Sequence, residues 1–521
     1  MFWAERIVGE IVERYKGHKG PIVIRDEKTV SGRIHVGAMR GVVIHGTLGA
    51  ILKERSVDAQ FIYELNDFDA LDSVPTYLEQ SEFEPHLGKP LFAVPYPGAK
   101  SYAEHFGNEF AGVIEQTGFS PKFTWSSQMY RAGKYNELIK TALESPNIVR
   151  RAYEEVSGGI RGEGWLPIMM ICEQCGKVAT TRPVSFDGKH VRYVCDQDGS
   201  GAKGCGFEGE KSPFDGNAKL PWKVEWAAKF TVYDVNVEGE GKDLSTKGGA
   251  RDVANRISTD LFKHTPPFDI RYEFLLIGGK KMSTSKGRGS SAKEISALVP
   301  AKIFRLAVLS KDFNQAVNFD PEGDTIPVLY DQYDKLATSY WAGTKDDYAR
   351  LFELIHPGHK APKQMYLPRF SQVAFIVQMP HLDVEKEVEK LKGSVLTEAD
   401  RVELDERVAY AKLWLKEYAP EKFVFELQKT LPEVAKDLSG AQKKALGELL
   451  RYIEVSPQIP SGEELHKKLH EIKEGQGIAP AELFKSIYLA FLGKTHGPQA
   501  GWFLSALERD FVLKRLKEAS I

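Results

Sequence analysis

Short apolar runs alternate with helical patterns along the first quarter of the chain, and this alternation constrains the fold more than any other feature. PIVI (21–24) is followed by a turn and a helical segment to about residue 55, and QFIYEL (60–65) is again strand-like. Further short apolar runs lie at 91–97 and 122–125. Strands that alternate with helices predict a parallel α/β sheet, whose ligands bind at the carboxyl ends of the strands.

The alternation is interrupted between about residues 165 and 215. This stretch is rich in Gly, Lys, Asp and Cys and has no long apolar run, so we interpret it as a small insertion. Strand-like sequence returns at 229–237 and 271–279, with a Gly-rich turn and a helical segment between them. The sheet is therefore expected to be built from two stretches of the chain.

The sequence after about residue 345 is helical in pattern. Segments 398–422 and 480–494 carry apolar residues three and four positions apart, and Gly493 follows the last apolar residue of the second segment. Ser461 and Glu464 have the spacing of a capping box. An all-α C-terminal domain is predicted, and the expected domain ranges are 1–90, 91–218 with a cysteine module at 165–215, 219–290, 291–345 and 346–521.

Charge and hydropathy leave the partner open. The net charge is −2, which does not indicate a nucleic-acid binder but permits one with a local basic face. No apolar run approaches the ~20 residues of a membrane span, and the N-terminus carries charges throughout, unlike a signal peptide. We expect a cytoplasmic protein that does not insert into membranes.

A basic loop, KKMSTSKGRGSS (280–291), directly follows a strand-like run. Its lysines, among them Lys281 and Lys286, can neutralise charge, and its backbone amides can bind oxygens, which suits a polyphosphate. A solvated basic loop is the commoner explanation for such a stretch taken alone. The strand before the loop favours the functional interpretation.

A second small-residue turn, SGRIHVG (31–37), follows the first strand-like run. Ser31 and Gly32 allow a tight turn, and Gly37 would let a flat base approach the backbone. His35 lies near a helix N-terminus and could donate to a phosphate oxygen there. For this motif alone an ordinary loop histidine is the better explanation.

Together the two motifs point to a family. HxG after the first strand and KMSxS after a late one resemble the paired signatures of class I aminoacyl-tRNA synthetases, and the chain resembles more closely the class I lysyl-tRNA synthetases. The resemblance covers nearly the whole chain. It includes NDFDALDSVP (66–75), SYAEHF (101–106), KLPWKVEWAAKF (219–230), GKD (241–243), RYEF (271–274) and the C-terminal segment 491–516.

The resemblance implies a fold and an activity. The fold would be a Rossmann-type catalytic domain split by a zinc-binding insertion and followed by a helix-cage anticodon-binding domain. Members join L-lysine to ATP, used with Mg²⁺, and transfer the lysine from the adenylate to tRNA(Lys). His35, Lys281 and Lys286 would be catalytic. The expected ATP-binding residues are Ser31, Gly32, His35, Gly37, Asp243, Lys281, Met282, Ser283, Ser285 and Lys286.

A lysine substrate needs a carboxylate for its ammonium and an apolar wall for its stem. From the resemblance, Trp226 and Tyr272 are candidates for the wall and Thr29 for a polar contact. From their chemistry, Asp26 and Glu27 are candidates for the carboxylate, and a charged strand end explains them equally well. The next candidates are Asp67 and Asp69, for which a turn-forming role is the better explanation.

All four cysteines lie in the insertion, at positions 172, 175, 195 and 205. A CxxC pair followed by two more thiols fits a tetrahedral zinc site formed by Cys172, Cys175, Cys195 and Cys205. Unliganded or redox-active thiols are the alternative. Four thiolates leave no open coordination position, so the zinc would be structural.

Some residues depart from the family pattern. Leu244 follows GKD where members often carry histidine, and Asp26 and Glu27 stand where many members have a Gly-containing run. These departures leave room for another class I specificity, for instance arginine. A tRNA-binding paralogue without ligase activity and a zinc-ribbon binding module are further alternatives, which the intact signature pair disfavours. The expected partners are tRNA(Lys), L-lysine and ATP, and a monomer is expected.

Overall fold

The computed structural model describes residues 2–279, 291–356, 358, 360–379 and 382–521. The chain forms two compact units. The first contains residues 1–320 and 335–362, and the second contains residues 321–334 and 363–521. Among the described residues, no helix is long and apolar enough to cross a membrane.

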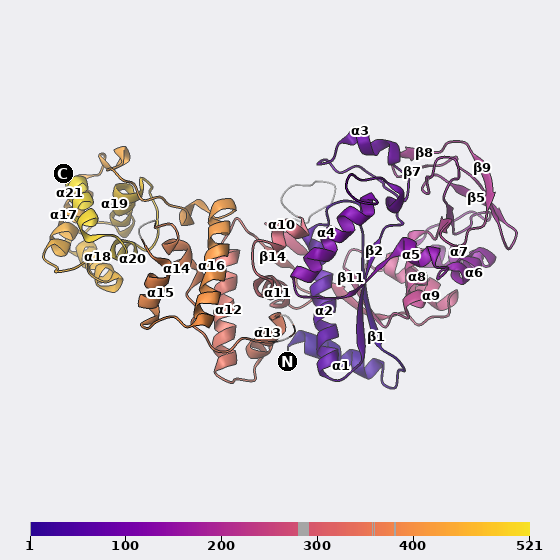
Figure 1. The fold of residues 1–521 in the computed structure, drawn as a ribbon, viewed down its shortest axis with the longest axis horizontal. Helices are drawn as coiled ribbons and strands as arrows, with labels where there is room; N and C mark the ends of the chain where they lie inside the picture. Colours follow the sequence, from indigo (N-terminus) through magenta and orange to yellow (C-terminus); the bar gives the residue numbers. More distant parts are fainter. Residues whose placement is uncertain (1, 280–290, 357, 359, 380–381) are drawn as a thin grey trace. The chain divides into compact units, whose positions relative to one another are not determined.

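A five-stranded parallel sheet forms the centre of the first unit, as the sequence predicts (Figure 1). Its strand order is β12-β11-β1-β2-β3. The strands are β1 (Ile22–Thr29), β2 (Ala59–Asn66), β3 (Lys122–Trp125), β11 (Val237–Gly241) and β12 (Phe268–Tyr272). The first strand pairs with β2 on one side and with β11 on the other. The chain thus reverses its strand order beside β1, which is where open α/β sheets bind ligands.

Helices cover both faces of this sheet. On one face lies α2 (Met39–Glu54), which begins after the short helix η1 (Val36–Ala38), with α1 (Trp3–Arg14) packed beside it. On the other face lie α8 (Trp222–Tyr233) and α9 (Ala250–Asp260), whose polar side chains contact β1 and β11. Successive strand residues point to opposite faces of the sheet, so neighbouring residues of β1 contact different helices.

The insertion between β3 and β11 is mixed in structure. It begins with α5 (Ser126–Arg131), α6 (Asn136–Glu144) and α7 (Pro146–Ser157). Its strands β5 (Arg182–Phe186), β6 (Val191–Val194) and β9 (Glu208–Lys211) form an antiparallel sheet. Two-residue strands complete it: β4 (Met169–Met170), β7 (Asp198–Gly199), β8 (Ala202–Lys203) and β10 (Ala218–Lys219).

The remaining elements of the first unit flank the sheet. Between β2 and β3 lie α3 (Gln80–Phe83), η2 (Glu84–His86), η3 (Leu91–Ala93) and α4 (Tyr102–Gln116). After β12 come β13 (Leu275–Ile277), α10 (Ala292–Ser296), α11 (Ala301–Leu309) and β14 (Val317–Phe319), and β13 pairs with β14. Helix α12 (Thr325–Trp341) begins in the second unit and ends in the first, which also holds α13 (Asp347–Ile355).

The second unit is helical around its own apolar core, as predicted. Thr397 caps α16 (Glu398–Glu417) and Ser439 caps α17 (Gly440–Glu454), each in a capping box. The expected box of Ser461 and Glu464 is present at α18 (Gly462–Gln476), and Gly493 ends α19 (Pro480–Leu492) with φ of 68°. The helices are α14 (Phe370–Ile376), α15 (Val384–Lys392), α16 (Glu398–Glu417), η6 (Glu421–Phe423), η7 (Glu433–Ala435), α17 (Gly440–Glu454), α18 (Gly462–Gln476), α19 (Pro480–Leu492), α20 (Ala500–Ser505) and α21 (Arg509–Ser520).

Three local predictions are wrong. Residues 229–237 are not one strand, because α8 runs to Tyr233 and β11 begins at Val237. Residues 224–230 of α8 are all buried, so the helix shows no one-sided pattern from which it could be recognised. Residues 91–97 form the short helix η3 and a turn, since prolines there cannot donate to a sheet. Residues 271–279 divide between β12 and β13, which belong to different sheets.

Candidate active site and metal centre

A cavity of about 540 Å³ lies at the carboxyl ends of β1, β11 and β12. The sequence candidates that line it come from segments up to 246 positions apart: Asp26, Glu27, Thr29, His35, Gly37, Asp69, Trp226, Asp243 and Tyr272. The structure thus brings together most of the residues proposed for ATP and lysine. A volume of this size is typical of a small-molecule site.

Other candidates lie elsewhere. Asp67 does not line the cavity, and its carboxylate accepts hydrogen bonds from the backbone N–H and the hydroxyl of Ser127 at 2.7 and 2.5 Å. Ser31 and Gly32 form the turn beside the cavity, where the Ser31 carbonyl accepts from the Tyr102 hydroxyl at 3.0 Å. The remaining candidates lie outside the described residues: Lys281, Met282, Ser283, Ser285 and Lys286.

In the first signature, SGRIHVG, the imidazole of His35 packs against Gly37. His35 has an extended backbone and precedes η1, which leads directly into α2. A Cβ atom at Gly37 would lie 2.7 Å from His35 Nδ1, so the imidazole occupies space that only glycine leaves open. His35 also forms a backbone bridge with Ser291, the last residue of the basic loop and the only one of its residues 280–291 that the structure describes. The first signature therefore pairs with the described end of the basic loop. The KMSTS signature itself lies outside the described residues.

Asp26 is held by a histidine that the sequence analysis missed. The Gly239 N–H donates to His45 Nε2 at 2.9 Å, so His45 carries its proton on Nδ1, and this N–H donates to Asp26 Oδ2 at 3.0 Å. His45 is completely buried in α2. A Cβ atom at Gly41 would lie 2.5 Å from Asp26 Oδ2 and 2.7 Å from the Tyr272 hydroxyl. Asp26 thus occupies a fixed position in the cavity wall, next to an aromatic hydroxyl.

Glu27 points to the opposite face and belongs to a buried network of charges. Its Oε2 accepts from Lys229 Nζ at 2.5 Å and forms an ion pair with Arg25. Arg25 also donates to Glu64 at 3.1 Å and to Glu238 at 2.8 Å. Burial raises the pKa of Glu27, but Lys229 and Arg25 outweigh this and lower it to about 2. Glu27 is therefore ionised and fully engaged by protein cations.

A second lysine extends the network toward β2. Lys219 Nζ donates to Glu225 at 2.6 Å and lies 3.1 Å from Asp69, which in turn accepts from the Thr29 hydroxyl at 2.5 Å. Burial raises the pKa of Asp69, but Lys219 and the Thr29 hydrogen bond bring it below its ordinary value. The sequence signal for the network is RDEK (25–28), four charged residues within a strand, with Glu225 and Lys229 one helical turn apart.

The aromatic candidates are also fixed by polar contacts. Trp226 Nε1 donates to Glu238 at 2.5 Å, and its ring stacks on Trp222 with centroids 6.0 Å apart. Burial and the nearby carboxylate of Asp26 raise the pKa of Tyr272 well above its ordinary value, so its hydroxyl stays protonated. Glu240 lies in the same wall, where burial raises its pKa to about 9 although Arg251 opposes the shift.

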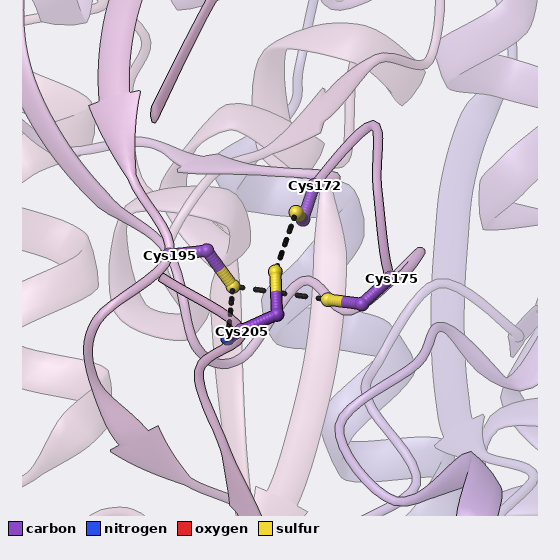
Figure 2. A group of neighbouring side chains, drawn as sticks. All are labelled: Cys172, Cys175, Cys195 and Cys205. Atoms are coloured by element: carbon purple, nitrogen blue, oxygen red, sulfur yellow. Dashed lines mark hydrogen bonds between the residues drawn. The ribbon is translucent and has the colours of Figure 1, made fainter. Parts of the chain in front are cut away.

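The four cysteines converge in the insertion (Figure 2). The Sγ atoms of Cys172 and Cys205 lie 3.7 Å apart, and those of Cys175 and Cys195 lie 3.8 Å apart. A tetrahedral zinc with Zn–S bonds of about 2.3 Å places its sulfurs about 3.8 Å from one another, so the four thiols fit this ion. Burial raises the pKa of the Cys172 thiol to about 12 when no cation is near.

Comparisons with known proteins identify the family. Residues 1–358 match the family model described as tRNA synthetases class I (K), and residues 402–520 match the anticodon binding domain. A lysine–tRNA ligase from Methanosarcina barkeri is 33% identical over 99% of this chain and 97% of its own length. Lysine–tRNA ligase 1 from Methanosarcina acetivorans is 34% identical over 100% of this chain and 98% of its own. The enzyme of that name from Archaeoglobus fulgidus is 30% identical over the full length of both chains. The chain therefore belongs to the class I lysyl-tRNA synthetases, enzymes that ligate lysine to tRNA.

Proposed function

We propose that the cavity at the carboxyl ends of β1, β11 and β12 is where this class I lysine–tRNA ligase forms lysyl-adenylate. The observation that carries the proposal is the convergence of His35, Asp26 and Asp243 on one cavity from three separate segments. In this reaction an oxygen of the lysine carboxylate attacks the α-phosphorus of ATP. The bond from that phosphorus to the bridging oxygen breaks, and its electron pair leaves with pyrophosphate.

The nucleotide would lie on the His35 side of the cavity. His35 donates to a phosphate oxygen, Gly37 gives the base access to the backbone, and Asp243 accepts from the ribose. The turn of Ser31 and Gly32 sets the direction in which the chain enters η1. From the basic loop, Lys281 and Lys286 neutralise the departing pyrophosphate while Met282, Ser283 and Ser285 contact ATP, which is used with Mg²⁺. Catalysis of this kind is mainly positioning and electrostatics.

The lysine side chain would lie on the Asp26 side. Of the two carboxylates on β1, we assign the ammonium to Asp26, because Glu27 already binds Lys229 and Arg25. Trp226 and Tyr272 form the wall for the aliphatic stem. At the edge of this wall the Thr29 hydroxyl donates a hydrogen bond to Asp69. The ion pair of Glu27 and Lys229 lies behind the wall.

The insertion would carry a structural zinc on Cys172, Cys175, Cys195 and Cys205. The support is the fit of the thiol spacing to tetrahedral zinc together with the absence of a disulfide among these thiols. When bound, the ion holds the four thiols as thiolates and ties together the chain before β5, after β6 and before β9. The C-terminal helical unit would bind the anticodon of tRNA(Lys). We also propose that the enzyme is a monomer and acts in the cytoplasm.

ATP–pyrophosphate exchange with each of the twenty amino acids, with and without total tRNA, tests the proposal. Exchange is expected with lysine, and His35→Ala should abolish it while His18→Ala, which alters an exposed loop histidine, should not. Exchange with arginine or another amino acid in place of lysine would identify that amino acid as the substrate. The absence of exchange in both arms, with tRNA still bound, would favour a tRNA-binding paralogue without ligase activity.

A further inference from the structure

Lys28 is a charged residue of the cavity that none of the roles above uses. It is the seventh residue of β1 and lies on the same face of the strand as Asp26, toward α2. It lines the cavity together with His35, Gly37 and Asp243. Its side chain is partly buried, and within the described part of the chain no oxygen forms a hydrogen bond or ion pair with its ammonium.

The other two lysines beside the cavity behave differently. Lys219 and Lys229 are buried, and each donates to a carboxylate, at 2.6 and 2.5 Å respectively. Burial lowers the pKa of Lys28, although Asp26, Asp243 and Glu27 act at longer range to raise it. A cation taken out of water without a partner is costly, and a bound anion would offset that cost.

We infer that Lys28 is a catalytic residue whose ammonium binds the α-phosphoryl group of ATP during adenylate formation. The inference rests on the proposed function, because that function supplies the anion. Lys28 interacts electrostatically with Asp243 and Asp26, which are assigned to the ribose of ATP and to the lysine ammonium. The α-phosphorus and the lysine carboxylate must meet between those two ends. The β- and γ-phosphates lie further along the nucleotide, and their contacts are assigned above to the lysines of the basic loop.

The chemical consequence is selective stabilisation of the transition state. As the carboxylate oxygen bonds to the α-phosphorus and the bond to the bridging oxygen breaks, negative charge is concentrated on the non-bridging oxygens. A fixed ammonium at that point binds the phosphoryl group of the bound nucleotide and interacts still more strongly with the transition state, so it raises the rate of the step as well as the affinity for the nucleotide. No proton is transferred to or from Lys28.

The first arm of the test measures catalysis. Single-turnover formation of lysyl-adenylate, with saturating tRNA, is compared for wild type, Lys28→Met, Lys28→Arg and the control Lys140→Met, which removes an exposed lysine from α6. Lys28→Met should slow the step by about 10²-fold, as loss of one preorganised donor does, with little change in the KM for lysine. Lys28→Arg should recover most of the rate, and Lys140→Met should match wild type.

The second arm measures binding and stability without activity. Calorimetric titration with AMP and with adenosine should show that Lys28→Met loses at least tenfold in affinity for AMP while its affinity for adenosine is unchanged. The melting temperature of the ligand-free Lys28→Met variant should equal or exceed that of wild type, because a partly buried charge without an ion-pair partner is removed. A structural role for Lys28 predicts a lower melting temperature instead.

Each way in which the inference can fail gives a different experimental result. Equal AMP-to-adenosine ratios in wild type and Lys28→Met would overturn the inference, as would a loss confined to the KM for lysine, which would place the ammonium on the lysine carboxylate. If wild type forms no adenylate with lysine, the proposed function fails, and the AMP titration still decides the contact of Lys28.

Discussion

Lys229 Nζ in α8 lies 2.5 Å from Glu27 Oε2 in β1, so the two residues form a buried ion pair across 202 positions of sequence. The lysine side chain is 1% exposed and the glutamate side chain 21%. The pair fastens the helix that carries Trp226 to the strand that carries Asp26.

Removing one partner of the pair should destabilise the protein. Lys229→Met removes one cation from each of three carboxylates, so that Glu27 and Glu64 keep only Arg25 and Glu225 keeps only Lys219. Loss of one partner of a buried pair typically costs about 3–5 kcal/mol. Urea unfolding of the variant and of the surface control Lys140→Met measures the difference. Equal midpoints would show that the pair contributes nothing.

The same pair should give a defined acid dependence. Folding lowers the pKa of Glu27 from 4.5 to about 2, so its contribution to the free energy of unfolding is complete above pH 4.5 and is lost as the pH falls toward 2. The stability difference between wild type and Glu27→Gln should therefore shrink between pH 4.5 and 2. A difference that is constant over this range would contradict the assignment.

Asp26 should govern the affinity for lysine. Asp26→Asn removes the charge but keeps the size. We expect the KM for lysine to rise at least tenfold, a change that corresponds to about 1.4 kcal/mol, with the KM for ATP little changed.

The two His45 variants test how Asp26 is positioned. His45→Asn retains a donor near Asp26 and should raise the KM for lysine only slightly, whereas His45→Gln retains an acceptor for Gly239 and loses the Asp26 contact. Equal KM values for the two His45 variants would argue against a positioning role.

Gly37 should be required for the placement of His35. Gly37→Ala puts a Cβ atom 2.7 Å from His35 Nδ1 and displaces the ring, so pyrophosphate exchange should fall toward the loss expected for His35→Ala, about 10²–10³-fold. Gly49→Ala, in which the new Cβ atom meets Ile24 at an ordinary 3.4 Å, is the matched control and should keep its activity.

Metal removal should unfold the insertion locally. All four cysteines of the chain lie in the cluster, so a thiol reagent reports on the cluster alone. We expect one zinc per chain, slow reaction of the thiols before chelation and rapid reaction of all four afterwards, with a lower melting temperature. Cys175→Ser should lose zinc stoichiometry, while rapid reaction of every thiol in the metal-loaded protein would exclude the site.

Several features could be predicted from local sequence. The strands at 22–29 and 59–66 follow from short apolar runs, and the caps at Ser461 and Gly493 follow from the geometry of a helix end. The cysteine spacing predicts the cluster because CxxC fixes two of its four thiols within one turn. The residue roles at the two signatures stay predictions that the experiments above decide.

Long-range pairing could not be predicted in the same way. Nothing near Glu27 in sequence indicates that Lys229 neutralises it, and nothing near Asp26 indicates His45 as its partner, since each strand residue selects its neighbours through the face to which it points. The buried helix α8 was missed for a related reason, because a helix covered on all sides has no amphipathic period. The sequence by itself determined the fold class, the two signatures and the cysteine cluster, which depend on local patterns. Only the tertiary structure decided which charged residues of RDEK form ion pairs within the core and which face the cavity, because this depends on what packs against each face of β1.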